Sequence, residues 1–518
     1  MECLWLNRQK KIISLPASNQ SFGNNNSIDD IRERRSQELV IGLCGASGSG
    51  VKTLKEKIIT KLKACNYHVV HIRISDLMAD TLSAAEAAEL KKLEGYEHFI
   101  QLQNLGNTLR EKHGNIINSE LVIRKIKVIR TANLNTGDFK GVSGKSTSKI
   151  AYIVDQLKHP EEVDLFREVY RNNFYLIGLV RTINERVINL KKDFLNDHQI
   201  AEIIRRDRRS EYPYGQHVED TLQCADYFIR NINNDQIKKS IARFIDLVHG
   251  ANNVSPSQDE TGMFTANSAA LRSACLSRQV GAAIMDDNCN ILSTGCNDVP
   301  AAGGGLYSCE SKSDKRCYNN DGCHSDMHKD LVRREVEAVI ARSDPSRANE
   351  LAIQIMKTPK IKSLIEYSRA IHAEMDAITT MARLANATTC GKTLYCTTYP
   401  CHNCARHIVA AGLKRVVYIE PYAKSLAEDL HGDSIAHADS TDKTKKVIFE
   451  NFEGTAPRRY TKFFGYSRPR KDDRGKPISY EIPASHHVDP QYLDSYGDSE
   501  SKVILNVTHK LRDEPLPD

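Results

Sequence analysis

The sequence predicts an α/β protein with two units, because strand and helix signals alternate in both halves of the chain. In the first half, an apolar run at 38–44 precedes a glycine-rich loop at 45–53 and an amphipathic stretch at 54–65. In the second half, apolar runs at 393–398 and 415–419 enclose a helical segment. Strand, helix and strand in that order are typical of a parallel sheet covered by helices. The 518 residues also exceed what one hydrophobic core holds.

The loop of the first half reads Gly45-Ala46-Ser47-Gly48-Ser49-Gly50-Val51-Lys52-Thr53. A phosphate-binding loop has this build, with backbone N–H groups and a helix N-terminus facing the anion. Val51 stands where a lysine normally follows the last glycine, so Lys52 and Thr53 are moved one place along. We therefore expect an NTP or dNTP effector here rather than kinase chemistry, with Mg²⁺ binding left open; the alternative is a structural glycine loop. The residues expected at the nucleotide are Gly45, Ser47, Gly48, Ser49, Gly50, Lys52 and Thr53.

Three more strands are expected in this half, at 67–75, 149–154 and 174–180, with helices between them. Asp155 follows the second of these strands and is a candidate for the acid of a nucleotide site. This order predicts a nucleotide-kinase-like fold. Four arginines are candidates for a phosphate-facing cleft; the alternative is that they are solvated helix residues. They are Arg181, Arg186, Arg205 and Arg206.

The second half carries His372, Glu374, Cys401 and Cys404 in the pattern H-x-E…P-C-x-x-C, which is typical of zinc-dependent deaminases of cytosine and adenine. One imidazole and two thiolates leave room for a water, as in catalytic rather than closed structural zinc sites. The two cysteines are three residues apart, so they share one face at the start of a helix. The alternative is half of a structural zinc ribbon, but the chain contains no second C-x-x-C.

The pattern predicts hydrolytic loss of an amine from a nucleobase. Zinc held by His372, Cys401 and Cys404 would make a water acidic near neutral pH. Glu374 would take the proton of that water, deliver it to ring nitrogen N3 and then protonate the departing amine, while hydroxide adds to C4 of cytosine. The products would be uracil and ammonia.

The chain resembles the deoxycytidylate deaminase family at 278–282, at 293–300, and at Tyr418 and Tyr422. The resemblance implies a cytidine-deaminase-like three-layer α/β/α domain. It also implies that Asn297 binds the deoxyribose, that Tyr418 or Tyr422 lines the sugar-phosphate side, and that Arg278 contacts the phosphate. Here Cys296 and Asp298 flank the asparagine, whereas the family usually has an aromatic residue and a glycine.

A long insert, 301–366, follows the asparagine and is rich in metal-binding side chains. Some deoxycytidylate deaminases have a second, structural zinc, and the insert with one upstream cysteine would supply its ligands. The alternative is reduced cysteines in a long loop, because the spacings match no standard zinc finger. The candidate residues are Cys275, Cys309, Cys317, Cys323, His324 and His328.

The whole chain resembles the bacterial anti-phage dCTP deaminases, which join a P-loop nucleotide-kinase-like domain to a deoxycytidylate-type zinc deaminase domain. The loop at 45–53, the runs at 152–160 and 214–221, and the zinc motif carry this resemblance. It implies conversion of dCTP, and also of dCMP, to deoxyuridine nucleotides, which depletes dCTP during infection. It further implies control by the first domain and assembly into a homo-oligomer. The sequence leaves open whether a nucleotide, a regulatory RNA or another signal activates the protein.

The predicted organisation has five segments. These are a flexible N-terminus at 1–36, the nucleotide-kinase-like domain at 37–235, a connection at 236–259, the deaminase domain at 260–465 and a C-terminal tail at 466–518. No run approaches the ~20 apolar residues of a membrane span, and the chain starts without a signal peptide. We therefore expect a cytoplasmic protein whose 14 cysteines are reduced.

Three rival functions differ from this expectation. A deaminase of RNA or single-stranded DNA would need a basic, aromatic-lined channel, but the net charge is only +6 and aromatic residues are 7% of the chain. A nucleotide-driven switch with secondary deamination would depend on Lys52. A nucleotide kinase fused to an inactive deaminase is disfavoured, because the zinc motif is complete and the glycine-rich loop is the irregular part.

Overall fold

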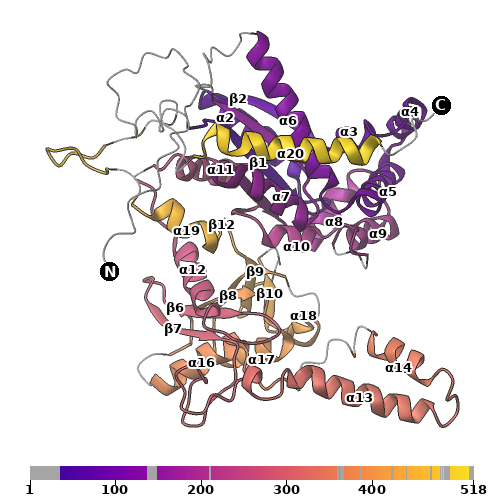
Figure 1. Cartoon of the computed structure of the whole chain (residues 1–518). Coiled ribbons are helices and arrows are strands. Elements are labelled where there is room, and N and C mark those ends of the chain that lie inside the picture. Colours follow the sequence, from indigo (N-terminus) through magenta and orange to yellow (C-terminus); the bar gives the residue numbers. More distant parts are fainter. Residues whose placement is uncertain are drawn as a thin grey trace, which may run out of the picture.

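Two six-stranded sheets, each covered by helices, build the protein (Figure 1). The computed structural model describes residues 35–136, 149–208, 210, 212–251, 253–358, 361, 367–384, 388–421, 425–438, 440, 442–466, 469–478, 480, 482 and 490–512. The chain is therefore a mixed α/β protein with mainly parallel sheets. Within the described residues, no helix is long and apolar enough to cross a membrane.

The first sheet has the strand order β12-β5-β4-β1-β3-β2. Its parallel strands are β1 (Leu39–Gly45), β2 (His68–Arg73), β3 (Ile150–Asp155), β4 (Phe174–Val180) and β5 (Tyr227–Arg230). Every residue of β1 and β3 is buried, as expected for parallel strands covered on both faces. The predicted strands at 38–44, 149–154 and 174–180 match β1, β3 and β4 within one residue at each end.

Helices cover both faces of the first sheet. The helices of this part of the chain are α2 (Val51–Ala64), α3 (Ile74–Ala79), α4 (Ala84–Lys92), α5 (Gly95–His113), α6 (Ile117–Thr136), α7 (Pro160–Tyr170), α8 (Ile183–Lys191), α9 (Asp197–Arg208), α10 (Val218–Gln223) and α11 (Asn234–Val248). One core packs α2 and α11 against the sheet, and α6 and α7 pack in the other. The glycine-rich loop thus leaves the carboxyl end of the central strand, where parallel α/β sheets bind ligands.

The second sheet has the order β10-β11-β9-β8-β6-β7. Its strands are β6 (Gly281–Met285), β7 (Ile291–Cys296), β8 (Thr393–Thr398), β9 (Arg415–Glu420), β10 (Ile435–His437) and β11 (Val447–Asn451). The strands β6 and β7 are antiparallel neighbours and form a hairpin. The predicted parallel pair is β8 and β9, which are joined through α17 (His402–Ala410).

The segment 236–259, predicted as the connection between the two units, consists largely of α11. This helix buries an apolar face that includes Ile241 and Phe244 against the first sheet. One hydrophobic core also runs from Phe166 of the first unit to Met263 of α12 (Gln258–Ala270) and Tyr395 of β8. The two units therefore share a core.

The C-terminal segments return to the first unit. β12 (Gly454–Thr455) pairs antiparallel with β5 at the sheet edge, and α19 (Pro457–Phe464) follows it. α20 (Leu493–Arg512) lies across the first unit and packs on α6 (Figure 1). The predicted tail from 466 onward thus contains a helix, α20, that packs on the first unit.

Parts of the predicted N-terminal segment and of the insert also have defined places in the fold. Of the predicted flexible segment 1–36, residues 1–34 lie outside the described part, while Ser36 is buried and hydrogen-bonds Tyr496 at 2.6 Å. The insert at 301–366 is not a plain loop, because α13 (His324–Ile340) and α14 (Ala348–Met356) form a helical pair that projects from the body (Figure 1).

Candidate metal centre and its cavity

Two helix starts place the residues of the zinc pattern. His372 directly precedes α16 (Ala373–Leu384), and Cys401 is the N-cap residue of α17. α16 packs closely on β7, where a Cβ at Gly295 would lie 2.2 Å from the carbonyl oxygen of Ala373. Only glycine permits this approach, so the strand fixes the start of the helix that carries the histidine.

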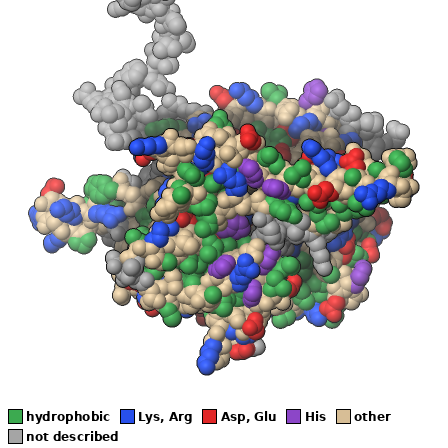
Figure 2. Space-filling view, turned by 90° about the horizontal axis from the view of Figure 1, so that it is seen from below, with side chains coloured by type: hydrophobic (Ala, Val, Ile, Leu, Met, Phe, Trp, Pro, Cys, Tyr) green, Lys and Arg blue, Asp and Glu red, His purple; other side chains and the backbone are tan. Residues whose placement is uncertain are grey.

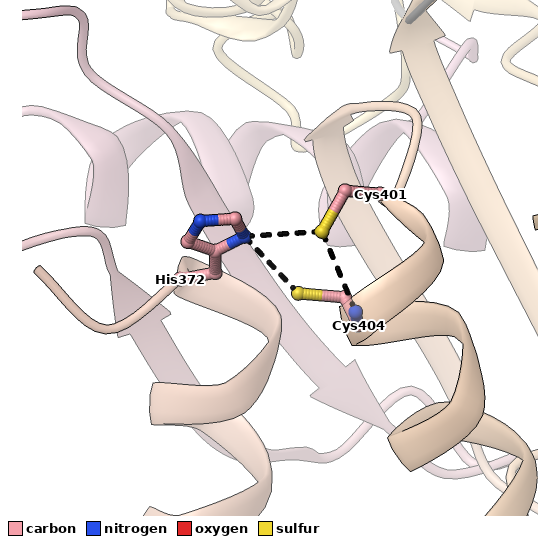
Figure 3. A group of neighbouring side chains, drawn as sticks. All are labelled: His372, Cys401 and Cys404. Atoms are coloured by element: carbon pink, nitrogen blue, oxygen red, sulfur yellow. Dashed lines mark hydrogen bonds between the residues drawn. The ribbon is translucent and has the colours of Figure 1, made fainter. Parts of the chain in front are cut away.

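The three predicted ligands come together in space. Nδ1 of His372 lies 3.3 Å from Sγ of Cys401 and 3.3 Å from Sγ of Cys404 (Figure 3). Their ligand atoms all lie within 4.8 Å of one another, and no other such group of three His, Cys, Asp or Glu residues occurs among the described residues. One imidazole and two sulfurs fit catalytic zinc.

The environment of Cys401 favours its thiolate. The hydrogen bond from Cys404 lowers the pKa of Cys401 to about 4, and the hydrogen bond from His372 adds to this against the effect of burial. The backbone N–H of Cys404 also points at the same sulfur, at 3.4 Å. Since the thiolate is the form that binds metal, this sulfur is ready for a metal at neutral pH. The hydrogen bond to Cys401 and burial raise the pKa of Cys404, so the second thiol has to give up its proton when metal binds.

Glu374 lies in the first turn of α16 and is 4% exposed. Burial raises its pKa, while the neighbouring His372 acts in the opposite direction. A carboxyl group whose pKa is raised toward neutrality both accepts and returns a proton readily. Its position beside His372 and Cys401 is the one that a proton carrier needs.

A cavity of about 1100 Å³ opens above these residues, and both units form its walls. His372, Glu374 and Cys401 line one side. Residues of α8, α9 and α10 from the first unit line the other side, among them Ile204 and Arg205. The first unit therefore completes the cavity that contains the metal centre.

The residues predicted at the sugar and phosphate have different places. Arg278 and Asn297 both line the cavity. The Asn297 amide accepts a hydrogen bond from the N–H of Val280 at 2.6 Å and donates to the carbonyl of Arg278 at 2.8 Å, so it also shapes this segment. Nη1 of Arg278 pairs with Glu420 at 2.7 Å.

Of the two predicted tyrosines, the structure describes only Tyr418. Tyr418 is 7% exposed and packs in the core of the second sheet, and it is not among the described residues that line the cavity. Tyr422 lies outside the described residues. Tyr399 lines the cavity instead and meets the ring of Tyr418 edge to face at 4.8 Å.

Sequence reasoning also missed two basic residues of the cavity. Arg369 and Lys329 both line it. Nη1 of Arg369 is buried and has no hydrogen-bond partner among the described residues. Its sequence signal was its place three residues before His372, next to the zinc pattern. Lys329 lies on α13 within the insert, where no motif marks it.

The candidates for a second zinc are only partly grouped. Cys275, Cys317, Cys323 and His324 line the cavity, whereas Cys309 and His328 do not. Nδ2 of Asn320 donates a hydrogen bond to Nε2 of His324 at 3.0 Å, and His328 stacks on Tyr367. The six side chains do not form a compact ligand set in the structure, so the second zinc stays a prediction.

The zinc content of the protein tests whether the insert binds a second zinc. We expect elemental analysis of the purified protein to find one zinc per chain, because among the residues that the structure describes only the His372 group has its donors within ligand reach. The variant Cys317→Ser should keep that zinc, and His372→Ala should lose it. A wild-type value near two that falls to one in Cys317→Ser would instead show a second site in the insert.

The predicted nucleotide loop forms the turn between β1 and α2. Gly48 and Gly50 have positive φ angles of 81° and 96°, as the loop conformation requires. Lys52 is exposed, and Val51 is buried in the core below the loop. Lys55, one helical turn from Lys52, reaches the predicted acid Asp155 at 3.3 Å.

The four candidate arginines do not share one cleft. Nε of Arg186 donates to the carbonyl of Ser47 at 2.9 Å, so this arginine lies at the loop, and Arg181 lies near Gly50. Arg205 lines the cavity of the metal centre. Arg206 donates to Asn104 at 2.9 Å.

Comparison with known proteins agrees with this site. A family described as "Cytidine and deoxycytidylate deaminase zinc-binding region" matches residues 256–420. The deoxycytidylate deaminase of Enterobacteria phage T4 is 30% identical over 155 residues, which are 30% of this chain and 72% of that protein. The deoxycytidylate deaminase of Saccharomyces cerevisiae is 29% identical over 167 residues, covering 32% of this chain and 39% of that protein.

Among solved structures, the dCMP deaminase of cyanophage S-TIM5 in complex with dCMP and dUMP covers 39% of this chain and 100% of that chain, with 21% identity and a TM-score of 0.24. So low a score adds nothing to the argument from sequence. The zinc-binding pattern, with its donors assembled, defines the second half as a zinc deaminase domain. The chain belongs to the deoxycytidylate deaminase family.

Proposed function

We propose that this protein hydrolyses the amino group of free deoxycytidine nucleotides, dCTP and dCMP, to give the deoxyuridine nucleotides and ammonia. The observation that carries the proposal is the assembly of His372, Cys401 and Cys404 beside buried Glu374 in a cavity of about 1100 Å³. That volume is large enough for one nucleotide.

The residues of the site have separate tasks. Zinc bound by the three donors would supply a Lewis acid that ionises water near pH 7. Glu374 holds the proton that leaves the water and transfers it to N3 of the base. It later carries the proton of the new hydroxyl group at C4 to the departing amine. One water is consumed and one ammonia is released. Asn297 holds the segment of Arg278 and Val280 at the cavity edge.

Basic residues at the cavity support a substrate with several phosphates. Arg369 brings a buried nitrogen that has no hydrogen-bond partner in the described part of the chain, and Lys329 and Arg278 line the same cavity. Arginine binds phosphate through paired hydrogen bonds. Together these cations offer charge for a triphosphate as well as for a monophosphate.

The surface supports free nucleotides over a polynucleotide. In the view from below, Lys and Arg side chains are scattered among Asp and Glu rather than gathered in one basic stripe (Figure 2). The cavity walls also carry acidic side chains, such as Asp197, Glu219 and Asp326. A nucleic-acid site would concentrate positive charge along a groove.

We further propose that the first unit controls the deaminase and that the biological role is depletion of dCTP in the cytoplasm during phage infection. Two features support the control: α8–α10 wall the cavity, and the glycine-rich loop ends the central strand of their sheet. Assembly into a homo-oligomer belongs to the same proposal.

A substrate panel tests the proposed reaction. Ammonia release should be measured with dCTP, dCMP, CTP, a cytosine-containing DNA oligonucleotide and the matching RNA. We expect turnover of dCTP and dCMP, and a rise of about ten-fold in KM for dCTP in Arg369→Ala, corresponding to one charge-assisted contact. The variant Arg334→Ala, on the exposed side of α13, is the matched control and should keep the wild-type KM. Deamination of the oligonucleotides alone would refute the proposal.

A further inference from the structure

The glycine-rich loop already holds an anion, which is a side chain of the protein. Asp207 is completely buried. Its Oδ2 accepts the backbone N–H of Ser47 at 2.6 Å, and its Oδ1 accepts a hydrogen bond from Lys158 at 2.8 Å. In phosphate-binding loops these N–H groups face a phosphate. Here the carboxylate takes the place of that ligand.

The loop has more donors than this carboxylate uses. Ser49 is 1% exposed and its Oγ has no partner among the described residues. Arg186 is 7% exposed, and its Nη2 likewise has no partner in the described part of the chain. Buried donors without partners are costly. A group with more acceptor oxygens, such as a polyphosphate chain, would satisfy them.

The helix that carries Asp207 also walls the metal-centre cavity. α9 presents Asp207 to the loop, while Ile204, Arg205 and Arg208 of the same helix turn line the cavity that contains Glu374. Arg208 is held there by an ion pair with Glu219 of α10. One helix therefore touches both sites.

The neighbouring helix, α8, contacts both the glycine-rich loop and α9. Leu190 of α8 lies against Gly48 of the loop, since a Cβ at Gly48 would be 2.9 Å from its Cγ. The same leucine packs with Ile200 and Ile203 of α9 in one apolar cluster. Packed helices move as units rather than residue by residue, so a change at the loop passes to α8 and α9 together.

We propose that Asp207 is a built-in competitor for a polyphosphate group at the 45–53 loop, and that α9 transmits occupancy of the loop to the deaminase cavity. Binding of the polyphosphate displaces the carboxylate from Ser47. The freed α9 then withdraws Arg205 and Arg208 from the cavity wall, and the substrate binds more weakly. The effect on the substrate rests on the proposed function, whereas the competition at the loop does not.

Calorimetry with the full-length variant Asp207→Asn tests the competition. Pyrophosphate and ATP are the two probes, since they share the polyphosphate and differ in the nucleoside. We expect Asp207→Asn to bind them about ten-fold more tightly than wild type, because a neutral amide competes less well than a carboxylate for the N–H of Ser47. Glu202→Gln, which neutralises another carboxylate of α9, is the control and should not change the affinity. Equal affinities in the two variants would overturn the proposal.

Hydrogen exchange on the wild-type protein gives a test without any variant. Saturating pyrophosphate should protect 45–53 and increase exchange at 203–208, and it should raise KM for dCTP at least three-fold. If the loop is protected but exchange at 203–208 is unchanged, α9 does not transmit occupancy of the loop. If only 369–374 is protected, pyrophosphate binds in the deaminase cavity, and the proposed polyphosphate site at the loop is refuted. If the protein deaminates no substrate but pyrophosphate still changes hydrogen exchange as expected, the proposed function is refuted. The competition between Asp207 and the polyphosphate at the loop is then still supported.

Discussion

Replacing Glu374 by Gln is expected to lower kcat for deoxycytidine nucleotides by about 10²- to 10⁴-fold, the usual contribution of a positioned proton carrier. The glutamine fills the same buried space but neither accepts the proton of the water nor returns it to N3 and the amine. His372, Cys401 and Cys404 are placed by the starts of α16 and α17, so we expect them to keep their positions. Steady-state ammonia release, together with zinc analysis of the same preparation, measures the effect.

The matched variants separate chemistry from metal binding. Glu374→Gln should retain zinc at the wild-type level, whereas His372→Ala should lose both zinc and turnover. Glu428→Gln, which removes an exposed carboxyl group near His437 on the same unit, should change neither. Turnover within ten-fold of wild type in Glu374→Gln would assign the proton transfers to another group.

The metal centre could be predicted because its geometry is encoded locally. His372 and Glu374 are two residues apart, and Cys401 and Cys404 share one helix turn, so a spacing rule carries most of the arrangement. β8, between them, was predicted at its observed ends, 393–398. Short apolar runs bounded by polar turns are the segments in which local pattern and tertiary burial agree.

Residues that act through tertiary contacts were not predictable in this way. Asp207 reaches Ser47 across 160 positions, and no rule of spacing links an acid on one helix to a loop so distant. Tyr418 shows the complementary problem. It lies on β9 opposite Cys396 of β8, and packing directs its ring into the core. The family resemblance predicts a tyrosine near the sugar and phosphate, but it does not predict the direction of this side chain.

The segments at 236–259 and after 465 show the same dependence on tertiary contacts. Their glycine- and proline-containing stretches are typical of linkers, yet α11 and α20, which lie in these segments, bury apolar side chains in the cores of the first unit. A two-residue strand such as β12 has no sequence signal of its own. Only the partner strand β5 defines it.

Asp226→Ala is expected to lower the free energy of unfolding by about 3 to 5 kcal/mol, the cost of removing one partner from a buried ion pair. Oδ1 of Asp226 lies 3.0 Å from Nε of Arg458 and 3.0 Å from Nε of Arg459, and Oδ2 accepts the N–H of Leu176 at 2.8 Å. Burial opposes ionisation of this carboxyl, but the neighbouring guanidiniums outweigh it and lower its pKa. The carboxylate thus fastens α19, and with it β12, to the first sheet.

Because β12 and α19 follow directly after the second sheet, loss of Asp226 should also loosen the joint between the two units and with it the shared wall of the cavity. Urea unfolding followed by circular dichroism measures the stability, and KM for dCTP should rise in parallel. Asp226→Asn keeps the acceptor for Leu176 and should cost less than Asp226→Ala. Asp164→Ala removes an exposed carboxylate 4.0 Å from Arg167 of the same region, and we expect it to stay within about 0.5 kcal/mol of wild type. Equal unfolding curves for Asp226→Ala and Asp164→Ala would show that α19 is held by its apolar contacts alone.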